Sequence, residues 1–186
     1  MKDPMMRVGG CAALCAIDTC LLRAMYFEED PEPLLGHPLG KPPFHLTREE
    51  YRALAMEMKP YLRPRWGGVS ELSTYMDGLN AFRVDRGLPE LSMKGFPMTE
   101  SAAQAEKALR EQIDSGLVVP CLILYTKQRS LKFYEWHWFL LNGYRETPRG
   151  LEVKATTYGS WRWLPLDKLW DTGHPDSGGL ILYEKG

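Results

Sequence analysis

The sequence lacks a long apolar segment and an excess of charge of either sign. No stretch reaches the roughly 20 consecutive apolar residues that a membrane-spanning helix needs. The 186 residues carry 23 basic and 24 acidic side chains, which gives a net charge of −1. We therefore expect no binding to nucleic acid or to a membrane surface. Asp3 and Pro4 interrupt the segment where a signal peptide builds its apolar core, so we expect a cytoplasmic protein.

Motifs for metals and nucleotides are also missing. There is no CxxC pair, no HxxxH pair, no P-loop and no GxGxxG at a strand–helix junction. His37 and His45 lie in a proline-rich segment, and His174 lies in a turn rich in Gly, Asp and Pro. The cysteines are Cys11, Cys15, Cys20 and Cys121. We expect free thiols, no metal site and no cofactor.

The composition is that of a globular protein. Hydrophobic residues make up 44% of the chain and charged residues 25%. A chain this apolar buries enough surface to offset the entropy lost on folding, which excludes disorder as the main state. Its length predicts a single domain over residues 1–186. The oligomeric state leaves no pattern in the sequence.

Helices are predicted mainly in the first half of the chain. Residues 11–27 are apolar nearly all round, as in a central, buried helix. Thr47 and Glu50 form a capping box before a helix over 47–59, which Pro60 is expected to stop. Further helices are predicted over residues 70–86 and 99–115.

The second half of the chain is predicted to form strands. These cover residues 117–125, 132–142, 151–157, 161–164 and 180–183, with hairpin turns at 127–130 and 146–150 and a short helical turn at 166–172. Helices followed by hairpin-connected strands indicate an α+β fold with a mainly antiparallel sheet.

Two residues in this pattern are candidates for catalysis. Cys11 follows Gly9-Gly10 at the start of the apolar helix, where the helix dipole and the first backbone amides favour a thiolate and a bound oxyanion. His137 lies in a predicted strand, and an imidazole beside a thiol acts as general base. The alternatives stay open: Cys11 as a core residue, and His137 as a half-buried strand residue.

The layout resembles the papain-like cysteine peptidases, in particular the bacteriocin-processing peptidase family and its stand-alone bacterial relatives. The resemblance covers residues 9–26 and roughly 99–170. The matching segments are GGCAALCAID, EKALREQIDSGLVVPCLILY, HWFLLNGY, LEVKATTYG and LPLDKLW. It implies a papain-like fold, in which an N-terminal central helix packs on a C-terminal antiparallel sheet, with a helical insertion at about 28–98.

The resemblance also implies roles for individual residues. Cys11 would be the nucleophile, its helix start would hold the oxyanion, and His137 would be the general base acting on a peptide or protein substrate. The family places an Asp or Asn on the strand after the His to orient the ring. Here Thr156 or Thr157 stands at that place.

Two departures from the family pattern predict low activity. Residues 1–10 contain no Gln to supply a second oxyanion donor, and Ala12 follows the Cys where a Gly is usual. The alternative function is a catalytically degenerate member of the fold that binds a peptide or a protein. The aromatic residues of the predicted strands favour that alternative, and they are Trp136, Trp138, Trp161 and Trp163.

Overall fold

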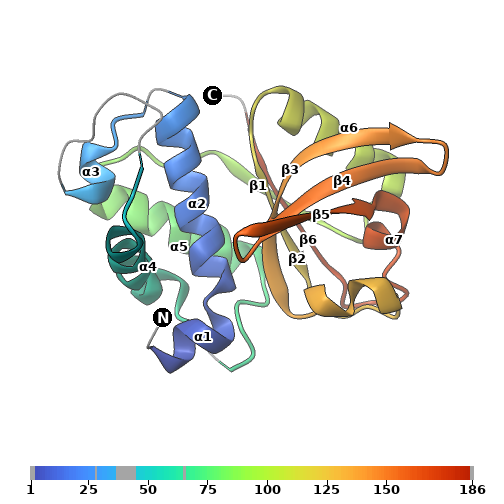
Figure 1. Cartoon of the computed structure of the whole chain (residues 1–186), viewed down its shortest axis with the longest axis horizontal. Coiled ribbons are helices and arrows are strands. Elements are labelled where there is room, and N and C mark those ends of the chain that lie inside the picture. Colours follow the sequence, from blue (N-terminus) through green and yellow to red (C-terminus); the bar gives the residue numbers. More distant parts are fainter. Residues whose placement is uncertain (1–2, 28, 37–44, 65, 185–186) are drawn as a thin grey trace. The chain divides into compact units, whose positions relative to one another are not determined.

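The computed structural model describes residues 3–27, 29–36, 45–64 and 66–184. The chain divides into two compact units, one comprising Met1–Val69 and Ser73–Leu91, the other Ser70–Leu72 and Ser92–Gly186. The first unit is helical, and the second combines helices with a sheet (Figure 1). The predicted α+β class is confirmed. The single domain with an insertion stays a prediction.

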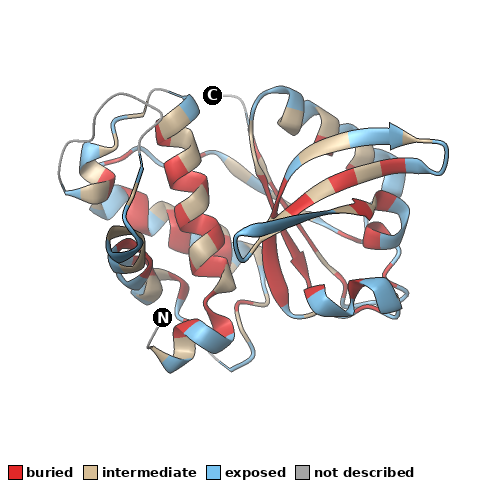
Figure 2. Cartoon of the chain, viewed as in Figure 1, coloured by how far each residue is buried: buried red, intermediate tan, exposed pale blue. Residues whose placement is uncertain are grey.

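The described part of the first unit is built from helices. They are α1 (Pro4–Gly9), α2 (Cys11–Tyr26), α3 (Glu32–Leu35), α4 (Arg48–Leu62) and α5 (Leu72–Asp85). Most side chains of α2 are buried, as its apolar sequence predicted (Figure 2). Helix α2 packs against α4, where the Tyr51 hydroxyl donates a hydrogen bond of 2.8 Å to the Asp18 carboxylate.

Helix α4 confirms its predicted start but not its predicted end. The Thr47 hydroxyl accepts a hydrogen bond from the Glu50 amide at 3.2 Å, and the Glu50 carboxylate accepts one from the Thr47 amide at 2.6 Å. The helix continues past Pro60 to Leu62. A proline this close to the end removes one intrahelical hydrogen bond and leaves no further turns to disrupt. Arg63, with φ of 44°, terminates the helix in the left-handed region.

The second unit contains a six-stranded sheet in the order β1-β6-β2-β3-β4-β5. All neighbouring strands are antiparallel, which confirms the predicted sheet type. The strands are β1 (Met93–Pro97), β2 (Val119–Ile123), β3 (His137–Thr147), β4 (Gly150–Thr157), β5 (Ser160–Pro165) and β6 (Gly178–Tyr183). Strand β1 was not predicted. It lies in the range 28–98, for which a helical insertion was implied, and it pairs with β6 instead.

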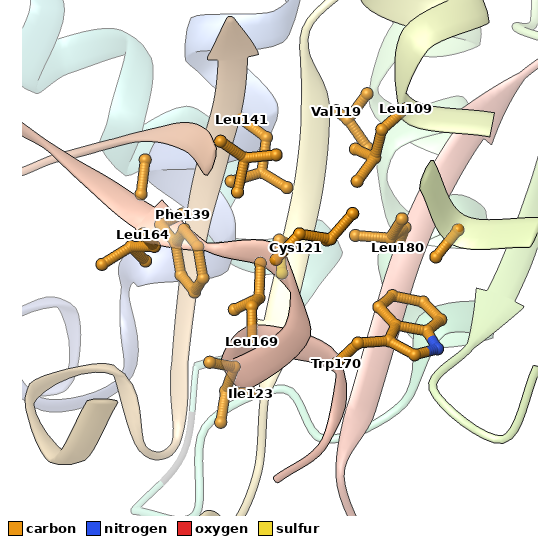
Figure 3. Packing of buried hydrophobic residues seen from close by; sticks show 14 of the residues in the cluster. Leu109, Val119, Cys121, Ile123, Phe139, Leu141, Leu164, Leu169, Trp170 and Leu180 are labelled. Atoms are coloured by element: carbon orange, nitrogen blue, oxygen red, sulfur yellow. The ribbon is translucent and has the colours of Figure 1, made fainter. Parts of the chain in front are cut away.

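The hydrophobic core of this unit lies on one face of the sheet. Helices α6 (Ala102–Asp114) and α7 (Leu166–Trp170) contact the strands there. Leu109 and Leu169 from these helices meet Cys121 and Phe139 from the sheet, and all four are fully buried (Figure 3). Each large apolar side chain buried in this way contributes about 1.5–3 kcal/mol to folding. This core fixes the strands that carry the candidate site.

The segment before β3 differs from its prediction. Residues 129–134 form a 3-10 helix, η1 (Arg129–Tyr134), where a turn and the start of a strand were expected. The Glu135 carboxylate accepts hydrogen bonds from the Thr126 amide at 3.0 Å and the Lys132 ammonium at 2.6 Å. Trp136 then adopts a φ of 53°, far from the negative values typical of β-strands. Trp136 therefore lies outside β3, although it was predicted to lie in one strand with Trp138.

Candidate active site

His137 is the first residue of β3 and is almost fully buried. Its backbone pairs with Ile123 of β2, and only 5% of the residue is exposed. Because side chains alternate along a strand, the imidazole lies on the same face as Phe139 and Leu141, which belong to the core. The ring therefore lies at the beginning of β3, on the core face of the sheet.

Thr157, the last residue of β4, supplies the hydrogen-bonding partner of this ring. The distance between His137 Nε2 and Thr157 Oγ1 is 2.7 Å. The Thr156 hydroxyl lies on the other face of the strand and donates to the Asn142 side-chain oxygen at 3.1 Å. Of the two threonines predicted near His137, the structure brings Thr157 to the ring and not Thr156.

A β-bulge in β3 determines which of the two threonine side chains faces His137. Near the hairpin turn, Thr147 pairs with Gly150 and Tyr144 with Val153. Beyond the bulge the register has shifted by one residue, and Leu141 pairs with Ala155. An unshifted register would set Leu141 opposite Thr156 and turn Thr156 toward the face of His137. The extra residue in β3 places Thr157 there instead.

Tyr158 covers the imidazole from the turn between β4 and β5. Its ring stacks on that of His137 with 4.9 Å between centroids and 20° between planes. Tyr158 and Gly159 both have positive φ, 50° and 70°, as a two-residue type I′ hairpin turn requires. A tyrosine in this conformation is strained by roughly 1 kcal/mol or more, and such strain gathers at functional sites.

The burial of His137 sets its charge. Burial disfavours the imidazolium and lowers the pKa of His137 from 6.5 to about 4. The ring is thus neutral at pH 7, and the same burial makes it a weaker base than an exposed imidazole. When Nε2 carries its hydrogen and donates it to Thr157, the basic lone pair lies on Nδ1.

Cys11 is the first residue of α2 in the first unit. Helix α1 precedes it, and Gly10 alone separates the two helices. A Cβ on Gly10 would lie 2.4 Å from the Met6 carbonyl oxygen, so only glycine fits at this position. The chain therefore places Cys11 at the beginning of a 16-residue helix whose cap residue has no side chain.

The four cysteines differ in accessibility. Cys15, Cys20 and Cys121 are 6%, 1% and 0% exposed, while Cys11 is only partly buried, and none of the four forms a disulfide. Burial raises the pKa of Cys20 to about 11 and raises that of Cys121 as well. Cys11 is therefore the most accessible thiol. Its pairing with His137, which belongs to the other unit, stays a prediction.

The remaining histidines form no metal centre in the described part of the chain. No group of three or more His, Cys, Asp or Glu side chains there is arranged to hold a metal ion. His174 lies in the predicted turn, where its Nδ1 accepts a hydrogen bond from the Asp176 amide at 3.2 Å. His37 lies outside the described residues.

Sequence reasoning missed the aromatic residues around the imidazole. Besides Tyr158, Phe133 and Tyr134 of η1 lie with ring centroids 6.3 and 6.5 Å from that of His137. The pair Tyr158-Gly159 between two predicted strands was the available indication of a hairpin turn. The 3-10 helix carries no comparable pattern, so nothing pointed to Phe133 or Tyr134.

Comparison of the chain with protein-family models, with curated proteins and with solved structures gives no match. Among the residues that the structure describes, no helix combines the length and apolarity required to cross a bilayer.

Proposed function

We propose that the protein is a cysteine peptidase or amide hydrolase of the papain-like fold, acting on a peptide or protein in the cytoplasm without a cofactor. Cys11 is the nucleophile and His137 the general base. The observation that carries the proposal is the 2.7 Å hydrogen bond between His137 and Thr157. It supports the proposal because it orients the imidazole, which is neutral at pH 7 as a general base has to be before it accepts a proton.

The proposed reaction has two halves. Cys11 Sγ attacks the substrate carbonyl carbon as its proton passes to His137 Nδ1, and backbone amides at the start of α2 hold the oxyanion. The intermediate collapses to a thioester when His137 returns the proton to the leaving amine. A water molecule, deprotonated by His137, then attacks the thioester, and Cys11 leaves with the proton.

The supporting groups predict a low rate. The hydroxyl of Thr157 fixes the ring but brings no charge to stabilise the imidazolium formed during attack. Residues 1–10 supply no Gln as a second oxyanion donor, and loss of one such donor costs about 100-fold or more in turnover. We expect faster hydrolysis of activated esters and thioesters than of peptide amides. Among peptides, we expect cleavage of unstructured ones only.

The test is hydrolysis of an activated thioester and of a peptide amide, combined with iodoacetamide labelling across pH. We expect Cys11 to be alkylated first, and turnover to disappear in Cys11→Ser and His137→Gln. His174→Gln is the matched control. His174 lies in the same unit as His137, and its Nδ1 accepts a hydrogen bond from Asp176 in its own turn. Equal, slow labelling of all four cysteines contradicts a nucleophilic Cys11.

One observation favours the alternative function, a degenerate module that binds a peptide or protein. Phe133, Tyr158 and Trp161 are 60%, 69% and 55% exposed, and exposed aromatic side chains are typical of binding surfaces. In that case no substrate is turned over by the native protein, and Cys11→Ser leaves peptide binding unchanged.

A further inference from the structure

A small pocket lies in the second unit between η1 and the β4–β5 hairpin. Its volume is about 120 Å³. An engineered cavity of roughly 150 Å³ holds one benzene molecule, whereas sites for drug-sized ligands begin near 300 Å³. The pocket therefore fits one ring or one branched side chain. The residues that line it include Phe133, Tyr134, Thr157, Tyr158, Ser160 and Arg162.

The polar groups of this pocket are matched to an anion. The residues that line the pocket include Arg162, Tyr134 and Ser160, but neither Asp nor Glu. Arg162 has no acidic partner among the described residues. In contrast, Arg145 pairs with Glu152 across neighbouring strands. A guanidinium without a carboxylate beside it is a ready binding group for one.

The pocket adjoins the candidate active site through Thr157. This residue lines the pocket and forms the hydrogen bond with the His137 ring. Tyr158 likewise lines the pocket and stacks on the ring. An occupant of the pocket thus contacts both residues that hold the imidazole.

We propose that this pocket is a subsite for a carboxylate carried on a short apolar or aromatic stem. The stem packs between Phe133 and the Tyr158 turn, and the carboxylate binds Arg162. As a substrate subsite beside His137, this assignment rests on the proposed function. Two parts of a peptide offer this chemistry, the C-terminal residue and the side chain of an internal glutamate.

The first test measures binding without turnover. The probe is 3-phenylpropionate, and the readout is the ring resonances of Phe133 and Tyr158, which line the pocket and are 60% and 69% exposed. We expect saturable shifts with 3-phenylpropionate and about tenfold weaker binding of 3-phenylpropionamide, which has no charge. Equal binding of acid and amide, or no shift at Phe133 and Tyr158, overturns the proposal.

Two variants test the role of the guanidinium. Arg162→Gln should weaken binding of 3-phenylpropionate about tenfold. Arg149→Gln, which removes the same charge from the β3–β4 turn, should leave it unchanged. Because Arg162 is exposed, its substitution leaves the core intact, and thermal unfolding of both variants verifies this. Equal binding by Arg162→Gln and the native protein overturns the assignment.

Competition identifies the source of the carboxylate. Displacement of 3-phenylpropionate by N-acetylphenylalanine indicates a C-terminal carboxylate, and displacement by N-acetylglutamate α-amide indicates an acidic side chain. Displacement by neither overturns the assignment as a peptide subsite. The same titrations in Cys11→Ser separate this proposal from the proposed catalysis, because binding persists there whether or not the native protein turns over a substrate.

Discussion

The side chains of His137 and Thr157 meet at 2.7 Å although 20 residues separate them in the chain. A hairpin with one bulged residue brings them together. The contact joins a neutral hydroxyl to a neutral ring. It therefore orients the imidazole but brings no negative charge to stabilise the imidazolium. Thr157 is thus a positioning residue, and its contribution differs in kind from that of an aspartate.

Replacing Thr157 by valine should lower Cys11-dependent hydrolysis of a thioester by about fivefold to tenfold. Valine keeps the shape but loses the hydrogen bond, which contributes about 1 kcal/mol. The control is Thr156→Val, whose hydroxyl bonds Asn142 on the other face and whose loss should change the rate less than twofold. Steady-state kinetics across pH measures both, and equal effects of the two substitutions contradict the orienting role.

Replacing Tyr158 by asparagine should raise the pKa of His137 from about 4 toward its ordinary value of 6.5. The substitution removes the stacked ring and admits water, while asparagine tolerates the positive φ of this turn better than tyrosine does. NMR titration of the imidazole protons measures the pKa. Tyr158→Phe keeps the ring and should leave the pKa low. A pKa near 4 in Tyr158→Asn would show that other groups bury the imidazole.

The second unit should lose stability as the pH falls from 6.5 to 4. Folded His137 binds its proton only near pH 4, whereas in the unfolded chain it does so near 6.5. The unfolded state therefore holds more protons in this window, which lowers the free energy of unfolding by up to about 3 kcal/mol. Urea unfolding followed by tryptophan fluorescence measures it. His137→Gln should flatten this dependence and His174→Gln should not.

Asp18 should produce the opposite dependence in the first unit. Burial raises its pKa from 3.8 to about 6, although the Tyr51 hydroxyl that bonds it acts to lower the value. The folded state holds more protons between pH 6 and 3.8, so stability rises as the pH falls through that window. Asp18→Asn should raise the free energy of unfolding at pH 7.5 by about 2–3 kcal/mol and give no gain below about pH 4.

The control for Asp18 is Asp77→Asn on α5, an exposed aspartate of the same unit. Its removal should change stability by less than about 0.5 kcal/mol. Circular dichroism during urea unfolding follows the helices of the first unit. If Asp18→Asn destabilises the protein at pH 7.5, the carboxylate has a charged partner whose loss outweighs the gain from its neutralisation.

The sequence predicted those elements that are specified by residues close together in the chain. The capping box at Thr47 and the alternating residues of β4 each fall within a few positions, and the structure confirms both. Strand β1 escaped prediction because Gly95 and Pro97 weaken its pattern and because it exists by pairing with β6, with Met93 opposite Tyr183.

In the candidate site, too, features set by neighbouring residues were predicted and features set by tertiary structure were not. Sequence placed a threonine beside His137 because a hairpin joins their strands, and that much is local. It left Thr156 and Thr157 equivalent, because one bulged residue reverses which side chain faces the ring. The stacking of Tyr158 depends on a left-handed backbone that residue preferences disfavour for tyrosine, so tertiary contacts have to maintain it.

The place of β6 in the sheet determines when this unit can complete its folding. Strand β6 lies between β1 and β2, yet it is the last strand to be synthesised. Until residues 178–183 have left the ribosome, β1 has no partner and one side of β2 stays open. Strands β2 to β5 are joined in sequence and form early, with His137 and Thr157 already in register. We therefore expect the candidate catalytic hairpin to form before the sheet is complete, while the side of β2 that later pairs with β6 is an unpaired edge.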